Sequence, residues 1–161
     1  AGLLSEHSTT RYSNAMKNDR ISRNFTYSEF ERSDTAALRG IDNTIPDDRI
    51  RRAVRLLVGN VLQPLRDAMG VPLHINSGYR SSTLNTLLRG ARNSQHTKGE
   101  AADIAAADPL HLAQAVIRNR LPFDQMILYS TFVHISHKPD GLQRGQILYD
   151  STYKEHYPDT L

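Results

Sequence analysis

The sequence predicts an α+β domain in which a mostly antiparallel sheet is covered by helices on one side. Helical patterns come first along the chain and strand-like runs come later, the order expected of segregated helices and strands. The 161 residues fit one domain. Hydrophobic residues make up 39% of them and charged residues 23%, which is typical of a globular chain with a single core.

Local signals place the individual elements. Thr26–Glu29 has the pattern of a capping box, and the short helical pair that it begins ends near Gly40. The strongest apolar helical face ends at Gly70, and Pro64 within it should cause a kink. The expected helices are 45–70, 82–89 and 108–119, and the expected strands are 71–76, 101–105, 123–129, 132–136 and 146–149.

The two ends of the chain differ from its middle. Residues 1–24 are polar and are expected to form an N-terminal tail, residues 25–149 the domain, and residues 150–161 a C-terminal tail. The first 24 residues lack the apolar core of a signal peptide, although a chain that starts at Ala1 is consistent with a removed leader. No apolar run is long enough for a membrane span, so none is expected.

The composition excludes several kinds of site. The absence of cysteine removes disulfides, thiolate zinc clusters and cysteine nucleophiles, so a metal site must use His, Asp or Glu. The formal net charge is +3, but the basic residues are scattered among acidic ones. A nucleic-acid-binding surface would combine a basic stripe with aromatic residues, so nucleic acid is not an expected partner.

His96, Asp103 and His134 are the strongest candidates for chemistry. His96 lies on a loop, Asp103 on the strand that follows it, and His134 on a separate strand. Small residues beside Asp103 would let that strand approach a neighbour closely. Two imidazoles and one carboxylate form a catalytic zinc set with a fourth position left for water. The spacing alone leaves the alternative of two surface histidines and an aspartate in a turn.

Motifs around these residues suggest a family. In chain order they are Ser77-Gly78-Tyr79-Arg80-Ser81, Leu84-Asn85, the SxHxxGxAxD pattern from Ser94 to Asp103, and Phe132-Val133-His134-Ile135-Ser136. Together they resemble the M15 family of zinc D-Ala-D-Ala peptidases, in particular bacterial zinc D-Ala-D-Ala carboxypeptidases and phage or prophage murein endopeptidases. The likeness covers about residues 25–149 and implies a DD-peptidase/hedgehog-like fold.

The resemblance also implies roles for single residues. His96, Asp103 and His134 become ligands of Zn²⁺, which can acidify a water and polarise the scissile carbonyl. Arg80 becomes a substrate-side cation, because a guanidinium can fork onto a carboxylate or hold a carbonyl oxygen. Ser94 becomes a substrate contact. The alternatives are a solvated arginine at a helix entry and a hydroxyl group in a turn.

The sequence departs from the family at the general base. Many members place Glu or Asp three residues before the last zinc histidine, where this chain has Thr131; others have Glu near the end of the preceding strand, where it has Leu128-Tyr129. Asp124, Glu100 and His137 are the remaining candidates, unless no protein base is used. Asp124 also suits a structural role at a strand start. Tyr129 either donates a hydrogen bond to the oxyanion or lies at the edge of the core.

These observations lead to two functional hypotheses. The first is a zinc metallopeptidase that hydrolyses peptide bonds of peptidoglycan stem peptides, as a D-Ala-D-Ala carboxypeptidase or an endopeptidase. It would act as a monomer at the bacterial cell wall or periplasm, and a phage or prophage origin is consistent with it. The second is a non-catalytic cell-wall-binding or phage structural protein that retains the zinc scaffold, and the missing carboxylate motivates it.

Overall fold

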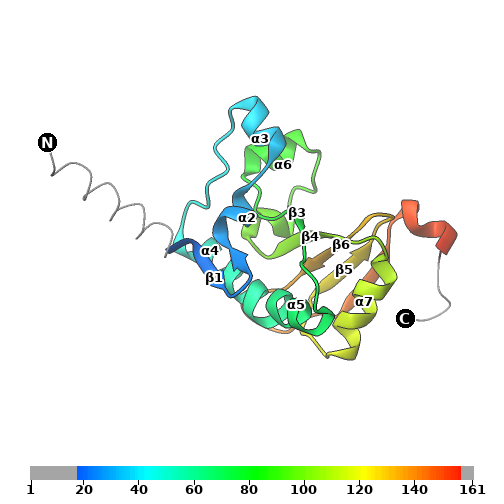
Figure 1. The fold of residues 1–161 in the computed structure, drawn as a ribbon. Coiled ribbons are helices and arrows are strands. Elements are labelled where there is room, and N and C mark those ends of the chain that lie inside the picture. Colours follow the sequence, from blue (N-terminus) through cyan, green and yellow to red (C-terminus); the bar gives the residue numbers. More distant parts are fainter. Residues whose placement is uncertain (1–17, 157–161) are drawn as a thin grey trace, which may run out of the picture.

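The structure is a computed structural model, and it describes residues 18–156 (Figure 1). Residues 1–17 and 157–161, which belong to the expected terminal tails, lie outside the described residues. The helices are α2 (Tyr27–Glu31), α3 (Asp34–Arg39), α4 (Asp48–Leu57), the π-helical η1 (Val58–Leu62), α5 (Gln63–Met69), α6 (Ser82–Leu87), the 3₁₀ helix η2 (Gln95–Lys98), α7 (Pro109–Arg118) and the 3₁₀ helix η3 (Ser151–His156). The strands are β1 (Arg20–Ser22), β2 (Phe25–Thr26), β3 (Ile75–Ser77), β4 (Ala101–Ala105), β5 (Gln125–Leu128), β6 (Phe132–Ser136) and β7 (Gln146–Tyr149).

The larger of two sheets carries the site. Its strand order is β3-β4-β6-β5-β7, and the fold class is α+β as expected. The expectation of a mostly antiparallel sheet needs correction, because the sheet is mixed: β5 and β7 are parallel. The reason lies in the connection 137–145. Strand β6 ends beside the start of β5, so a short loop delivers the chain to that same end, and β7 must then run in the direction of β5.

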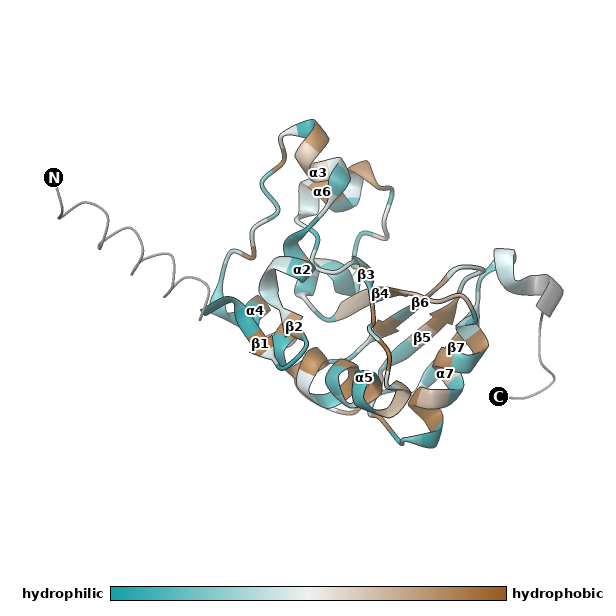
Figure 2. Ribbon diagram, in the orientation of Figure 1, coloured by the Kyte–Doolittle hydropathy of each residue, from teal (hydrophilic) through white to brown (hydrophobic). Residues whose placement is uncertain are grey.

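The two faces of this sheet have different neighbours. On one face, Leu112 and Val116 of α7 pack with Met126, Val133 and Ile135 in the hydrophobic core. Helix α5 and the turn η1 contribute to the same core, as the apolar stripes in Figure 2 indicate. The alternate strand positions face the other way and border a cavity. The period of two along each strand therefore separates the packing residues from the site residues.

The long helix predicted over residues 45–70 forms with a change of geometry inside it. Asp47 caps its start by accepting a hydrogen bond from the backbone of Ile50, and Gly70 ends it at φ 67°. The segment η1 is π-helical, and the backbone N–H of Gln63 donates to the carbonyl of Val58. Pro64 has no N–H with which to continue the α-helical pattern, so the irregular turn lies directly before it.

Two regions near the N-terminal half differ from the sequence expectation. Strand β3 begins only at Ile75, because Pro72 cannot donate to a ladder and Val71 is about half exposed. Strand β1 lies in the segment expected to be a tail and pairs antiparallel with β2. Within the described part of the chain, no helix is long and apolar enough to span a membrane.

Candidate metal centre

A tight turn places His96 at the edge of the sheet. Ser94 caps η2, and its hydroxyl accepts a hydrogen bond from the backbone N–H of His96 at 3.2 Å. Gly99 ends the turn at φ 72°, a left-handed conformation that favours glycine. A Cβ at Gly99 would lie 2.8 Å from the side chain of Ile50 in α4. The missing side chain thus lets this turn lie directly against α4.

Strand register brings the other two residues to the same place. Asp103 of β4 is paired directly with His134 of β6, and His134 is paired with Ile127 of β5. All three side chains line the cavity. Because directly opposite residues in an antiparallel pair have neighbouring Cβ atoms, this register puts the carboxylate beside the imidazole.

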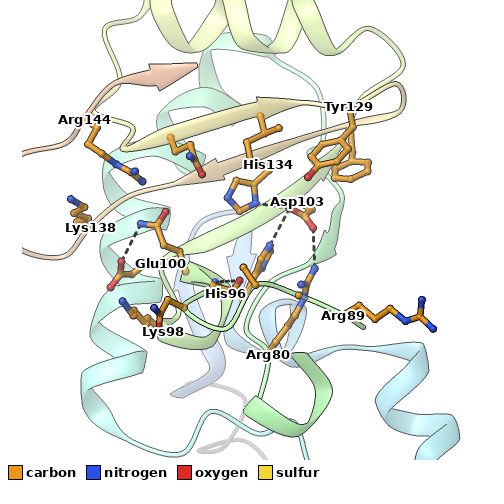
Figure 3. Close-up of a pocket in the computed structure, with 18 residues that line it drawn as sticks. Arg80, Arg89, His96, Lys98, Glu100, Asp103, Tyr129, His134, Lys138 and Arg144 are labelled. Atoms are coloured by element: carbon orange, nitrogen blue, oxygen red, sulfur yellow. Dashed lines mark hydrogen bonds and ion pairs between the residues drawn. The ribbon is translucent and has the colours of Figure 1, made fainter. Parts of the chain in front are cut away.

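The three candidate ligands converge as expected from the sequence (Figure 3). The Oδ1 atom of Asp103 lies 3.1 Å from Nε2 of His96 and 2.9 Å from Nδ1 of His134. One ligand atom from each residue lies within 4.8 Å of the others. His96 and Asp103 are buried, while His134 is partly exposed toward the cavity. These residues form a possible metal site.

The hydrogen bonds of His96 test whether a cation fits there. Its Nδ1 donates to the carbonyl oxygen of Gly78 at 2.7 Å, and a carbonyl can only accept. In the neutral ring, Nε2 then carries a lone pair, and it faces the carboxylate of Asp103. Two acceptors 3.1 Å apart need a shared cation, either a proton or a metal ion. The donor set therefore suits zinc, which favours imidazole and carboxylate ligands.

The electrostatics of Asp103 favour the ionised form. Burial raises the pKa of this carboxyl, but the imidazoles of His96 and His134 outweigh burial and hold the pKa well below its usual range. Arg80 adds an ion pair, with Nη2 at 3.3 Å from Oδ2 of Asp103. The Asp103 carboxylate is therefore available as an anionic ligand.

Arg80 is fixed by its neighbours. Its Nε donates to the hydroxyl of Ser77 at 3.0 Å, and its backbone N–H donates to the carbonyl of His96. The side chain lines the cavity, and 15% of it is exposed. The guanidinium thus reaches the candidate metal site from the same segment that holds the ring of His96 through Gly78.

The cavity has a volume of about 730 Å³. Its lining includes Asp103 and one further carboxylate, that of Glu100, which accepts a hydrogen bond from Gln95. Tyr129 lines the cavity with its hydroxyl pointing toward the candidate ligands, and its ring stacks on Phe132 at 4.1 Å between centroids (Figure 3). Burial and the charge of Asp103 raise the pKa of Tyr129. A neutral hydroxyl that can donate a hydrogen bond therefore faces the site.

Asp124 lies away from the cavity. Its side chain is fully buried and accepts hydrogen bonds from Arg144 and from Gln95. Burial raises the pKa of Asp124, but the hydrogen bonds and charge of Arg144, with a hydrogen bond from Gln95, lower it to about 2. Asp124 thus ties the loop 137–145 to the turn that carries His96.

Thr131, which stands where many family members carry the base, and His137, a base candidate, have other surroundings. Thr131 is exposed in the turn between β5 and β6 and does not line the cavity. His137 is buried, with Nδ1 at 2.6 Å from the carbonyl of Pro122 and Nε2 at 3.1 Å from the side-chain nitrogen of Asn60. Both ring nitrogens of His137 therefore serve contacts within the fold.

Sequence reasoning did not identify four basic residues that line the cavity: Arg89, Lys98, Lys138 and Arg144. Arg89 is distinguished by its backbone conformation, a positive φ of 58° directly before a glycine, which the sequence does not reveal. The other three come from a 3₁₀ turn and an irregular loop. No periodic pattern marks such positions, although Lys98 lies inside the SxHxxGxAxD motif.

Comparisons with known proteins agree with this arrangement. The family Peptidase M15 matches residues 23–136, a segment that includes all three candidate ligands and Arg80. The zinc D-Ala-D-Ala carboxypeptidase of Streptomyces albus G is 39% identical over 84 residues, which make up 52% of this chain and 31% of that relative. The matched segment thus spans about a third of the relative's length.

Proposed function

The chain belongs to the peptidase M15 family, and from this premise we propose that it is a zinc peptidase acting on the stem peptides of peptidoglycan at the cell wall. One observation carries the proposal: His96, Asp103 and His134 converge in a cavity large enough for a short peptide. The relative's name supports the choice of zinc and of a D-Ala-D-Ala bond as the substrate class.

His96, Asp103 and His134 would hold the zinc ion. Bound there, zinc supplies a Lewis acid that polarises the scissile carbonyl and lowers the pKa of a water molecule. Gly78 orients the ring of His96 through its carbonyl, so that Nε2 faces the metal position. Ser94 orients the same residue from the backbone side and acts as a positioning residue.

Arg80 and Tyr129 are the groups proposed to contact the substrate. The guanidinium of Arg80 can bind a substrate carboxylate or the carbonyl oxygen next to the cleaved bond. The hydroxyl of Tyr129 can donate a hydrogen bond to the negative charge that develops on that oxygen. Asp124 is a positioning residue in this scheme, because its carboxylate is buried behind Gln95.

A muropeptide profile tests the proposal. Purified peptidoglycan is incubated with the zinc-loaded protein and, separately, with the chelator-treated protein, and the fragments are analysed by mass spectrometry. We expect new fragments only with zinc. Loss of one terminal D-Ala would identify a carboxypeptidase, and separation of cross-linked peptides would identify an endopeptidase. A folded, zinc-loaded protein that produces no fragments contradicts the proposal.

The metal assignment has its own test. His96→Ala and Asp103→Ala each remove a ligand, so we expect the loss of stoichiometric zinc in elemental analysis. His74→Ala is the matched control, because His74 is an exposed histidine outside the cavity. Full zinc content in both ligand variants would overturn the assignment.

A second candidate function is cell-wall binding without hydrolysis. It is favoured by the absence of a carboxylate at the two places where the family resemblance puts the general base, Leu128-Tyr129 and Thr131. Tyr129 lines the cavity and Thr131 does not, so Tyr129→Glu is the better restoration. A positioned base contributes about 10²–10⁴-fold in rate. If Tyr129→Glu hydrolyses the peptide faster by this factor, the wild-type site lacks only its base. Fast hydrolysis by the wild-type protein would rule out a role limited to cell-wall binding.

A further inference from the structure

One end of the cavity carries more positive charge than the proposed reaction uses. Lys98, Lys138 and Arg144, the lysine end, lie on one side of the candidate metal ligands (Figure 3). Arg80 and Arg89 lie on the other side (Figure 3). The reaction proposed above requires only the cation nearest the cleaved bond. The lysine end therefore needs a separate explanation.

The lysine end is a pre-formed part of the fold. The backbone N–H of Lys138 donates to the side chain of Gln143 at 2.8 Å, and the side chain of Gln143 donates back to the carbonyl of Lys138 at 2.9 Å. The backbone N–H of Arg144 donates to Asp124 at 2.9 Å. These bonds close the loop between β6 and β7 on itself and attach it to the sheet. Its two cations are thus held at the cavity before any ligand arrives.

The acidic neighbours leave this end positive. Asp124 is buried, and it accepts hydrogen bonds from Nε and Nη2 of Arg144. Nζ of Lys138 lies farther from the same carboxylate, at 3.6 Å, and 38% of its side chain is exposed. A single buried carboxylate cannot neutralise both cations. Glu100, which lines the cavity, is the second carboxylate at this end, and Lys98 is the third cation.

Donor groups at this end remain unused. Among the described residues, Nη1 of Arg144 and Nζ of Lys98 have no hydrogen-bonding partner, and Nζ of Lys138 has only its long ion pair. An ammonium group of a ligand would be repelled here, and an amide would leave the positive charge unpaired. A carboxylate accepts several charge-assisted hydrogen bonds at once. Carboxylate is therefore the chemistry that fits.

Resting on the proposed function, we infer that the lysine end is a specificity subsite that binds a carboxylate of the peptide substrate. This carboxylate is a different group from the one beside Arg80. The bound peptide passes the metal position with an acidic group toward each end of the cavity. The site thus prefers doubly acidic peptides over peptides with one carboxylate.

Synthetic peptides test the subsite directly. The probes are acetylated tetrapeptides that end in D-Ala-D-Ala, with glutamate or glutamine at the first or second residue and with a free or amidated C-terminus. Their dissociation constants for the zinc-loaded protein are measured by calorimetry in low and high salt. Mass spectrometry after each titration reports whether the peptide was cleaved.

We expect either the glutamate side chain or the free C-terminal carboxylate to strengthen binding about tenfold in low salt, relative to the corresponding glutamine or amide. One or two charge-assisted hydrogen bonds would have an effect of this size. The double variant Lys98→Gln/Lys138→Gln should reduce this preference to less than about twofold. Arg118→Gln, which removes one exposed positive charge from α7, is the matched control and should retain the preference.

The outcomes separate the subsite from the proposed function. Equal affinity for all peptides, or a preference that survives in the double variant, overturns the subsite even if the peptides are cleaved. A preference that depends on Lys98 and Lys138 supports the subsite even if no peptide is cleaved, and in that case the proposed function fails alone. Binding of no peptide by the wild-type protein overturns the subsite as well.

Discussion

At the scale of one residue, Arg80 shows how the fold fixes the position of a side chain in the site. Its guanidinium donates to Ser77 and pairs with Asp103, so its position is set before a substrate binds. Both neighbours lie on adjacent strands, β3 and β4. A lysine in its place would retain the charge but could not make both contacts in the same geometry.

Arg80→Lys is therefore expected to lower kcat/KM by about 10–100-fold, the worth of one or two charge-assisted hydrogen bonds. The zinc content should not change, because Arg80 is not among the proposed ligands. Kinetics on a D-Ala-D-Ala peptide and elemental analysis of the same sample check both parts. A variant with full activity, or one that has lost zinc, would contradict the proposed role.

Asp124 makes a prediction about pH and stability. Its pKa is about 2 in the folded protein and about 3.9 in an unfolded chain, so folding favours the ionised form. The stabilisation is fully present above pH ~5 and is lost as the pH falls toward 2. Asp124→Asn should lower the urea midpoint at pH 7 and make it less sensitive to pH between 5 and 3.

The comparison of Asp124→Asn with the wild type is made on metal-free protein at every pH, so that loss of zinc does not contribute. Asp140→Asn is a suitable control, since Asp140 pairs with Arg52 on the surface and is largely exposed. Parallel pH curves for Asp124→Asn and the wild type would show that the Arg144–Asp124 interaction does not stabilise the fold.

Single residues also show what sequence can reveal about a site. His96, Asp103 and His134 could be found because their motifs are continuous segments of chain with characteristic spacing. A structural role for Asp124 at a strand start was among the expectations, but its partners could not be derived in this way. Its meaning depends on Gln95 and Arg144, which lie about 30 residues before it and 20 after it. Only the folded chain brings these groups together.

At the scale of elements, the turn η2 depends on a glycine. Gly99 has a positive φ and contacts α4 so closely that an added Cβ would meet both the side chain and the carbonyl of Ile50. Gly40 has a similar φ of 64° at the end of α3, but an added Cβ there would meet nothing within 4 Å. An alanine at Gly40 would therefore cause backbone strain alone, whereas an alanine at Gly99 would cause both backbone strain and steric overlap.

Gly99→Ala should destabilise the fold by about 2–5 kcal/mol, the sum of left-handed strain and overpacking. Gly40→Ala should cost only about 1–2 kcal/mol. Urea unfolding of both variants measures the difference, and zinc titration should show weaker binding for Gly99→Ala alone. Equal losses of unfolding free energy in the two variants would mean that α4 shifts to accommodate the new methyl group.

The elements themselves differ in how far sequence predicts them. Strands β4, β6 and β7 occupy the predicted residues, because alternation and flanking polar residues mark their ends. The direction of β7 was not predictable from its four residues, since it depends on the route of the loop 137–145. The π-helical turn was anticipated only as a kink at Pro64, because a proline removes one hydrogen bond without specifying its replacement.

At the scale of the whole molecule, the candidate metal site joins segments that are distant in the sequence. His96 lies on a turn against α4, while Asp103 and His134 lie on neighbouring strands of the sheet. A ligand that bridges these parts binds the folded protein and not the unfolded chain, so it shifts the unfolding equilibrium. The zinc-loaded protein should therefore be more stable than the chelated protein.

We expect zinc at about 100 times its dissociation constant to stabilise the fold by about 2.7 kcal/mol and to raise the Tm by several degrees. Differential scanning calorimetry with zinc and with excess chelator measures this shift. The Asp103→Ala variant serves as the control and should show no zinc-dependent change. A shift of equal size in that variant would place the stabilising ion elsewhere on the protein.

The late position of β7 in the chain has a consequence for synthesis. Strand β5 is an inner strand in the finished sheet, but it emerges from the ribosome before residues 146–149 exist to cover its outer side. During that interval, its unpaired backbone groups can recruit a strand from another nascent chain. The exposure of the β5 edge is therefore a hazard of the unfinished polypeptide, and slow translation between β6 and β7 would increase it.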